Sequence, residues 1–303
     1  MKVSDYTLSS AYDGLSISVL SVCPDAYPKA VVQLAHGMCG SKERFLAFMK
    51  YLAQNGIACF ANDHRGHGES IMAERDRGYM FEGGSEALVD DMRMLTENIR
   101  EQYPEIPLFL LGHSMGSMAA RAYLKQYPDA LDGGIICGSP SYNPLAPVGY
   151  AFLSAVCLCG CGRLRPKILQ SFTSAMYNRR FASEGPQAWV CSDPEVRRIF
   201  LDDPRHNFVF TFNASRALLS LMLQSYSSKG WKKISSALPV LFLYGSDDPC
   251  AGGTSGIGKA ASVLQKAGYR HISIKTYPAM RHEILNEIGK ERVWRDILEF
   301  IGQ

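Results

Sequence analysis

One short segment of the chain, 112–116, reads Gly-His-Ser-Met-Gly and combines a nucleophilic residue type with the spacing of a tight turn. The apolar segment before it, 107–111, is typical of a strand, and Met115 to Tyr127 has the pattern of a helix. Bulky side chains at the two glycine positions would clash with neighbouring backbone in such a turn. The serine hydroxyl would then be exposed at a helix N-terminus, where the partial positive charge favours an anionic oxygen. This pattern predicts that Ser114 is a catalytic nucleophile.

A serine hydroxyl needs a base that takes its proton, and the chain offers seven histidines. His282 follows the last predicted strand in a short loop, and such a loop ends at the same sheet edge as Ser114. His113 lies on the serine's own turn, where its side chain should point away. We therefore predict that His282 is the base.

The base in turn needs a carboxylate that orients it. Asp247 and Asp248 directly follow the predicted strand 239–244, and either gives the chain order serine, aspartate, histidine. The residue pattern alone does not choose between them.

Backbone N–H groups that stabilise an oxyanion are expected at two places. One is Met115, directly after the nucleophile, and the other lies in the loop 36–40 after an early strand. Gly37 and Gly40 in this loop let the backbone approach a reacting carbonyl group.

Strand-like and helix-like segments alternate along the chain, which predicts an α/β fold with a parallel sheet and helices on both faces. A mostly helical stretch interrupts the alternation. We expect 1–139 and 239–303 to form an α/β core and 140–238 to form a helical cap, or lid. The expected strands are 31–35, 57–61, 107–111, 134–137, 239–244 and 271–277; the expected helices are 41–55, 85–103, 115–127, 256–268 and 284–301.

Composition excludes several classes of protein. With 47% hydrophobic and 20% charged residues, the chain is neither disordered nor fibrous. A net charge of +3 without a basic run argues against a nucleic-acid partner. The nine cysteines are scattered, and the first residues lack a signal-peptide pattern, so we expect reduced thiols and a cytoplasmic protein. The apolar stretch 145–162 is interrupted by Pro147 and glycines, which favours a buried or lipid-facing surface helix over a membrane span.

Three motifs suggest other chemistry but fit it poorly. The segment 253–259 resembles a phosphate-binding loop, yet Ala260 stands where serine or threonine is required. The polar segment 63–70 is better explained as a hydrogen-bonded loop than as a metal site. Cys157, Cys159 and Cys161 lack the spacing of zinc ligands. We expect no cofactor and no metal.

These motifs together resemble the α/β-hydrolase superfamily, specifically its capped lysophospholipase and monoacylglycerol lipase-like branch, also known as serine aminopeptidase S33-like hydrolases. The resemblance implies an α/β-hydrolase fold with a mostly parallel eight-stranded sheet and a helical cap after the sixth strand. It also implies that Asp248 is the acid and that Met38 carries the second oxyanion N–H group. The matching segments are 36–38, 63–70, 112–116, 244–249 and 281–283.

The expected function is a serine hydrolase that cleaves carboxylic esters through a Ser114–His282–Asp248 triad and an acyl-enzyme. We expect a small-molecule ester substrate with an apolar acyl chain, and transient contact of the cap with lipid surfaces. Apolar cap residues either line an acyl pocket or pack the cap onto the core; they are Phe152, Leu153, Val156, Leu158, Leu218, Leu219, Leu221 and Met222.

Two alternatives stay open. A proline-type aminopeptidase would need a cap carboxylate that holds a substrate amine, and the candidates are Glu184, Asp193, Asp202 and Asp203. A non-catalytic protein that binds apolar ligands on the same fold is the second alternative, although binding alone needs no nucleophile.

Overall fold

Eight strands form one sheet in the computed structural model, which describes residues 1–232 and 237–302. Their order across the sheet is β1-β2-β4-β3-β5-β6-β7-β8. β1 and β2 pair antiparallel, as do β2 and β4, and the remaining pairs are parallel. The predicted α/β fold with a mostly parallel eight-stranded sheet is therefore confirmed. The strands are β1 (Lys2–Ser9), β2 (Ser16–Cys23), β3 (Ala30–Ala35), β4 (Ile57–Asn62), β5 (Leu108–His113), β6 (Gly133–Cys137), β7 (Val240–Gly245) and β8 (Ile272–Tyr277).

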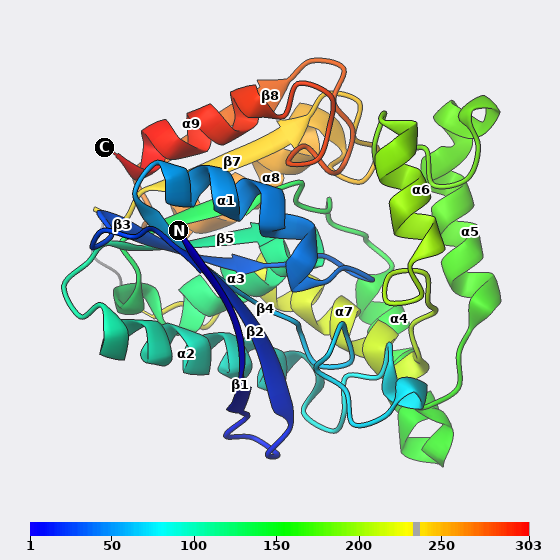
Figure 1. Ribbon diagram of the computed structural model, residues 1–303. Helices are drawn as coiled ribbons and strands as arrows, with labels where there is room; N and C mark the ends of the chain where they lie inside the picture. The colour runs from blue at the N-terminus through cyan, green and yellow to red at the C-terminus, as the bar shows by residue number, and fades with distance from the viewer. Residues whose placement is uncertain (233–236, 303) are drawn as a thin grey trace.

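Helices cover both faces of the sheet, which explains why the central strands are continuous apolar runs. Strands β3 to β7 are buried along almost their whole length, whereas β1 and β8 at the two edges are largely exposed. One core cluster contains side chains from α1 (Leu46–Gln54) and α9 (Glu291–Ile301). The other contains side chains from α2 (Gly84–Gln102), α3 (Met115–Gln126) and α8 (Gly253–Lys266). Figure 1 shows α1 and α9 on one side of the sheet and α2 on the other.

Two predicted helices differ from the structure. The helix expected over 41–55 divides into a 3-10 turn, η1 (Lys42–Phe45), and α1. The helix expected over 284–301 begins only at Glu291. The residues before it form a loop because the Glu287 carboxylate accepts the backbone N–H groups of Arg281 and Ile288, at 2.9 and 3.2 Å.

The stretch between β6 and β7 is helical in the part that the structure describes. Figure 1 shows α4, α5 and α6 standing beyond one end of the sheet, while α7 runs back toward it. Leu221 of α7 belongs to the same buried cluster as Met118 of α3. Residues 233–236 of the predicted cap lie outside the described residues. The elements are α4 (Ala146–Val156), the π-helical turn η4 (Cys157–Cys161), α5 (Lys167–Asn178), the 3-10 segment η5 (Arg179–Glu184), α6 (Pro194–Asp202) and α7 (Phe212–Tyr226).

The search for membrane-spanning helices gives a negative result. Within 1–232 and 237–302, no helix combines the length and the apolarity that crossing a bilayer requires.

Candidate active site

Ser114 lies between β5 and α3, in a backbone conformation that L-residues rarely adopt. Its φ is +54° and its ψ −118°, and its N–H donates to the Cys137 carbonyl oxygen at 3.0 Å. A Cβ on Gly112 would lie 2.2 Å from the Gly116 carbonyl oxygen, and one on Gly116 would lie 2.1 Å from the Ala35 carbonyl oxygen. Only glycine fits at these two positions, so the sequence holds the serine in a strained turn.

A chain of hydrogen bonds joins three side chains from three separate loops. His282 Nε2 lies 2.8 Å from Ser114 Oγ, and His282 Nδ1 lies 2.9 Å from Asp248 Oδ2. The other oxygen of Asp248 accepts the backbone N–H of Cys250 at 2.8 Å. Asp248 and His282 are both buried. The imidazole of His282 is thus placed to take a proton from the Ser114 hydroxyl, while Asp248 holds its other nitrogen.

The surroundings of His282 shift the pKa of its imidazole. Burial acts to lower its pKa, but the charge of Asp248 and the hydrogen bond to it outweigh burial, so that the pKa of His282 is raised above its ordinary value. The Asp248 carboxylate therefore stabilises the imidazolium that would form when His282 accepts a proton.

Asp247, the other aspartate candidate, points elsewhere. Its carboxylate faces Arg180, with Oδ1 3.2 Å from a guanidinium nitrogen, and it is partly exposed. The structure brings Asp248, and not Asp247, against His282.

The loop expected to supply an oxyanion N–H group lies against Ser114. A Cβ on Gly37 would lie 2.9 Å from Ser114 Cβ, so these two residues are in close contact. Gly40 N–H donates to the Gly37 carbonyl oxygen at 3.0 Å and closes the loop around Met38. Met115 begins α3 and is buried. Gly37 of the predicted loop and Met115 therefore both adjoin Ser114.

His113 makes a contact that the sequence did not indicate. Its side chain points toward the loop of the base, where Nε2–H donates to the His282 carbonyl oxygen at 3.1 Å. Burial, together with the neighbouring His282, lowers the pKa of His113 to about 4, so the ring is neutral. His113 thus supports the backbone at His282.

Three other histidines form a separate buried cluster, and a fourth, His206, is buried with its Nε2 2.9 Å from Ser41 Oγ. His36 Nε2 accepts the His64 backbone N–H at 2.9 Å. The centroid of the His36 ring lies 4.3 Å from that of His64 and 5.1 Å from that of His67. Burial lowers the pKa of His64 to about 3 and those of His67 and His206 to about 4. The contacts of the His36 ring join the loop 36–40 to the segment 63–70.

The polar segment 63–70 fastens loops, as the sequence suggested. The Asp63 carboxylate accepts the backbone N–H groups of Lys42 and Glu69 at 2.8 and 2.9 Å and pairs with Lys42 Nζ at 3.0 Å. Arg65 is buried and pairs with Asp91 at 2.8 Å. These charged groups satisfy one another, whereas three ring nitrogens of the segment, His64 Nδ1, His64 Nε2 and His67 Nε2, are buried without a hydrogen-bond partner among the residues that the structure describes.

The cap carboxylates considered for a substrate amine are already in use. Asp193 caps the N-terminus of α6 through the backbone N–H of Glu195 at 2.9 Å. The other three pair with arginines: Glu184 with Arg281 and Arg197, Asp202 with Arg198, and Asp203 with Arg205.

The apolar cap residues divide into two groups. Leu153, Leu221 and Met222 are buried and pack within the protein, whereas Phe152 and Leu158 are exposed. Leu218 and Leu219 pack against the larger core cluster. Packing therefore explains several of these residues.

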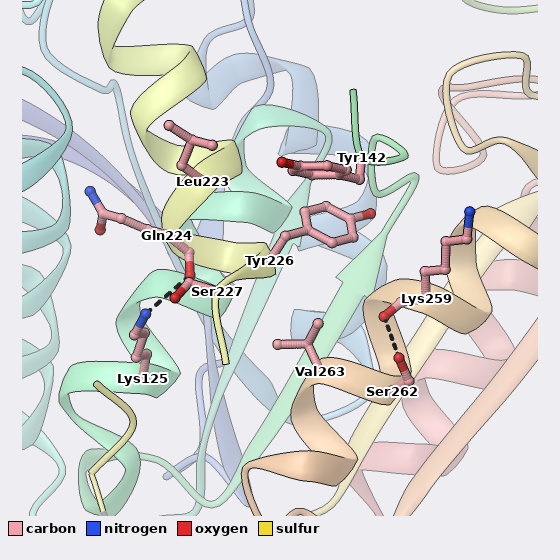
Figure 2. A pocket seen from close by; sticks show the side chains of 9 residues that line it. All are labelled: Lys125, Tyr142, Leu223, Gln224, Tyr226, Ser227, Lys259, Ser262 and Val263. Atoms are coloured by element: carbon pink, nitrogen blue, oxygen red, sulfur yellow. Dashed lines mark hydrogen bonds between the residues drawn. The ribbon is translucent and has the colours of Figure 1, made fainter. Parts of the chain in front are cut away.

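Two further features are a group of ligand-type atoms at the Ser114–His282–Asp248 cluster and a hollow away from it. Ligand-type atoms of Asp248, Cys250 and His282 lie within 4.8 Å of one another, but the aspartate and the histidine are already hydrogen-bonded to each other. A separate hollow of about 670 Å³ lies between α3, α7 and α8. Figure 2 shows Lys125 and Lys259 among the side chains that line it. None of the side chains of the Ser114 cluster lines this hollow.

Comparison with known proteins points to one family. A family model described as serine aminopeptidase S33 matches residues 26–289. A monoacylglycerol lipase from Mycolicibacterium smegmatis is 27% identical over 285 residues, which cover 92% of this chain and 90% of that relative.

Solved structures agree with this result. A highly thermostable carboxyl esterase from Bacillus coagulans, in complex with glycerol, matches with a TM-score of 0.89 at 25% identity, over 100% of this chain and 98% of the esterase. A soluble variant of monoglyceride lipase from Saccharomyces cerevisiae matches with a TM-score of 0.73 at 19% identity, over 100% and 95% of the two chains. This second likeness shows the fold alone.

Proposed function

The chain belongs to the serine aminopeptidase S33 family of α/β hydrolases and is a carboxylic ester hydrolase, and we propose that it works through a Ser114–His282–Asp248 triad. The observation that carries this proposal is the continuous hydrogen-bond chain from Ser114 Oγ through the imidazole to the buried carboxylate. A serine without an adjacent base would be a weak nucleophile.

In the first half of the reaction, Ser114 Oγ attacks the ester carbonyl carbon while His282 Nε2 takes the hydroxyl proton. The backbone N–H groups of Met38 and Met115 stabilise the oxyanion, and the loss of one such donor typically costs about 3–4 kcal/mol of barrier stabilisation. The tetrahedral intermediate collapses as the C–O bond to the alcohol breaks, and His282 returns the proton to the leaving alkoxide. A water molecule then attacks the acyl-enzyme by the same route and releases the acid.

We propose a monoacylglycerol or a lysophospholipid, with a medium or long acyl chain, as the substrate class. The name of the Mycolicibacterium relative supports the first of these. An ester is favoured over a peptide because the carboxylates that would hold a substrate amine are paired with arginines or used to cap a helix.

Residues 140–238 would act as the cap over this site, and their outer surface suits transient contact with lipid. Large apolar side chains are exposed along α4, η4 and α5. Between Asp132 and Glu184 the sequence has five basic residues and no acidic one. The exposed apolar side chains are Leu145, Val148, Phe152, Leu158, Leu164, Ile168, Phe172 and Met176.

A reducing compartment such as the cytoplasm is part of the same proposal. It is supported by the nine cysteines, all of which are free thiols.

The experiment is a series of initial rates on p-nitrophenyl esters with acyl chains of increasing length and on a monoacylglycerol, for the wild type and Ser114→Ala. We expect hydrolysis that peaks at medium or long chains and disappears in the variant. Activity that survives in Ser114→Ala would contradict the triad. A peak at acetate would contradict the proposed substrate class.

A further inference from the structure

The loop that carries His282 is held by a segment of the cap, Phe181–Ser192, which we call the cap strap. The strap is far from His282 in the sequence, but it contacts the residues on both sides of the histidine. These contacts are hydrogen bonds and ion pairs with defined partners.

Arg281, directly before the histidine, makes most of them. One guanidinium nitrogen donates to the Ala188 carbonyl oxygen at 2.6 Å, and the other donates to both carboxylate oxygens of Glu184, at 2.7 and 2.9 Å. The guanidinium carbon lies 3.9 Å from the centroid of the Phe181 ring. Arg281 is buried, and its hydrogen bonds to the Glu184 carboxylate are charge-assisted, which makes them stronger than bonds between neutral groups.

The other side of the histidine is held in a similar way. Glu283 N–H donates to the Val190 carbonyl oxygen at 2.8 Å. Glu287 accepts the Arg281 backbone N–H at 2.9 Å and the Ser192 backbone N–H at 2.8 Å. The residues directly before and after His282, Arg281 and Glu283, are therefore both bonded to the strap.

The strap also contacts the imidazole itself. The centroid of the Trp189 ring lies 5.1 Å from that of the His282 ring and 4.9 Å from that of Tyr177 on α5. The indole N–H of Trp189 donates to Gln187 Oε1 at 2.8 Å, which fixes the indole in place.

From this arrangement we propose that Arg281 is a positioning residue that couples the cap strap to the catalytic base. This inference rests on the proposed function. The Asp248 hydrogen bond sets the tautomer of the imidazole, while the strap, through Arg281, sets where Nε2 lies relative to Ser114 Oγ. The strap is therefore a fixed part of the active site.

The expected size of the effect follows from geometry. His282 Nε2 lies 2.8 Å from Ser114 Oγ, and a displacement of about 1 Å can cost about 100-fold in rate. Loss of the Arg281 contacts should act on chemistry and leave substrate binding unchanged.

The test compares Arg281→Met, Arg281→Lys and Glu184→Gln with Arg198→Met as the matched control. Arg198 is also a cap arginine, and it pairs with Glu195 and Asp202 without contacting the histidine loop. Rates are expressed per reactive serine, counted by stoichiometric phosphorylation with diethyl p-nitrophenyl phosphate, so that unfolded protein does not contribute.

We expect Arg281→Met to lower kcat by about 10- to 100-fold with KM unchanged. Arg281→Lys should restore part of the rate because a lysine keeps the charge but has a single nitrogen in place of the two that bond to Ala188 and Glu184. Glu184→Gln should give a smaller drop in the same direction and add nothing to Arg281→Met in the double variant. Arg198→Met should match the wild type.

Wild-type kcat per reactive serine in Arg281→Met would overturn the inference, as would a change in KM alone. The result is separable from the proposed function. If Ser114→Ala is inactive and Arg281→Met is fully active, only the role of Arg281 fails. If Ser114→Ala keeps its activity, the triad itself fails.

Discussion

Replacement of Asp248 by asparagine tests the electrostatic part of the mechanism most sharply. Asp248 Oδ1 accepts the Cys250 backbone N–H, and Oδ2 faces His282 Nδ1. In Asp248→Asn the amide oxygen keeps the Cys250 contact, so the amide NH₂ group points at Nδ1. The histidine must then accept at Nδ1 and carry its proton on Nε2, where it cannot take the proton of Ser114.

The expected loss is large because the wrong tautomer blocks the chemical step. In serine proteases the equivalent change lowers kcat by about 10⁴-fold, which corresponds to about 5.4 kcal/mol of barrier. The side-chain volume is nearly unchanged and the Cys250 hydrogen bond is kept, so we expect the melting temperature to stay close to that of the wild type. The assay is steady-state hydrolysis of a medium-chain p-nitrophenyl ester, with a thermal melt of the same samples.

Asp247→Asn is the matched control, because Asp247 faces the exposed guanidinium of Arg180 and does not touch the imidazole. We expect near wild-type kcat from it. A fall of less than tenfold in Asp248→Asn, or a larger fall in Asp247→Asn, would refute the assignment of the acid.

Three more outcomes follow from the structure. The pKa of His282 is raised above 6.5, and the base must be neutral to accept a proton, so kcat/KM should fall with decreasing pH through a midpoint above 6.5. A midpoint below 6.5 would contradict the raised pKa. Gly116→Ala places a Cβ 2.1 Å from the Ala35 carbonyl oxygen and should lower the free energy of unfolding by about 1–3 kcal/mol, measured by urea denaturation; an unchanged midpoint would show that the turn relaxes. Exposed Cys159 should react first with a bulky disulfide reagent, and activity should be kept because Cys250 and Cys39 are both buried. Inactivation when only Cys159 is modified would contradict this expectation.

Local sequence patterns were sufficient to predict the central sheet and the tight turn at Ser114. Strands such as β5 are buried on both faces and read as apolar runs, and the two glycines around Ser114 mark a turn that other residues would not fit. The sequence did not reveal β1, because an edge strand such as Lys2–Ser9 is mostly polar and exposed. It also extended the last helix too far, since nothing local shows that the Glu287 carboxylate binds the backbone of Arg281.

Contacts between distant segments were beyond the reach of the sequence. Two adjacent aspartates follow β7, and only the three-dimensional arrangement shows which one faces His282. Trp189 carries no recognisable motif, yet its ring contacts the His282 ring from a distant part of the chain. Arg281 lies beside His282 in the sequence, but nothing local shows that it bonds to Ala188. The Ser114 turn can be recognised from the sequence because its backbone geometry restricts the residue types at Gly112 and Gly116. The contacts of the cap strap depend on tertiary packing and leave no such pattern.

The most direct test of the central claim is to find the residue that forms the covalent enzyme intermediate. The native protein is treated with diethyl p-nitrophenyl phosphate, residual ester hydrolysis is followed, and the modified peptide is sequenced by mass spectrometry. We predict one phosphoryl group per chain, on Ser114, with loss of activity in proportion to labelling. Complete inactivation with the label on another residue, or full labelling of Ser114 with activity retained, would contradict the triad.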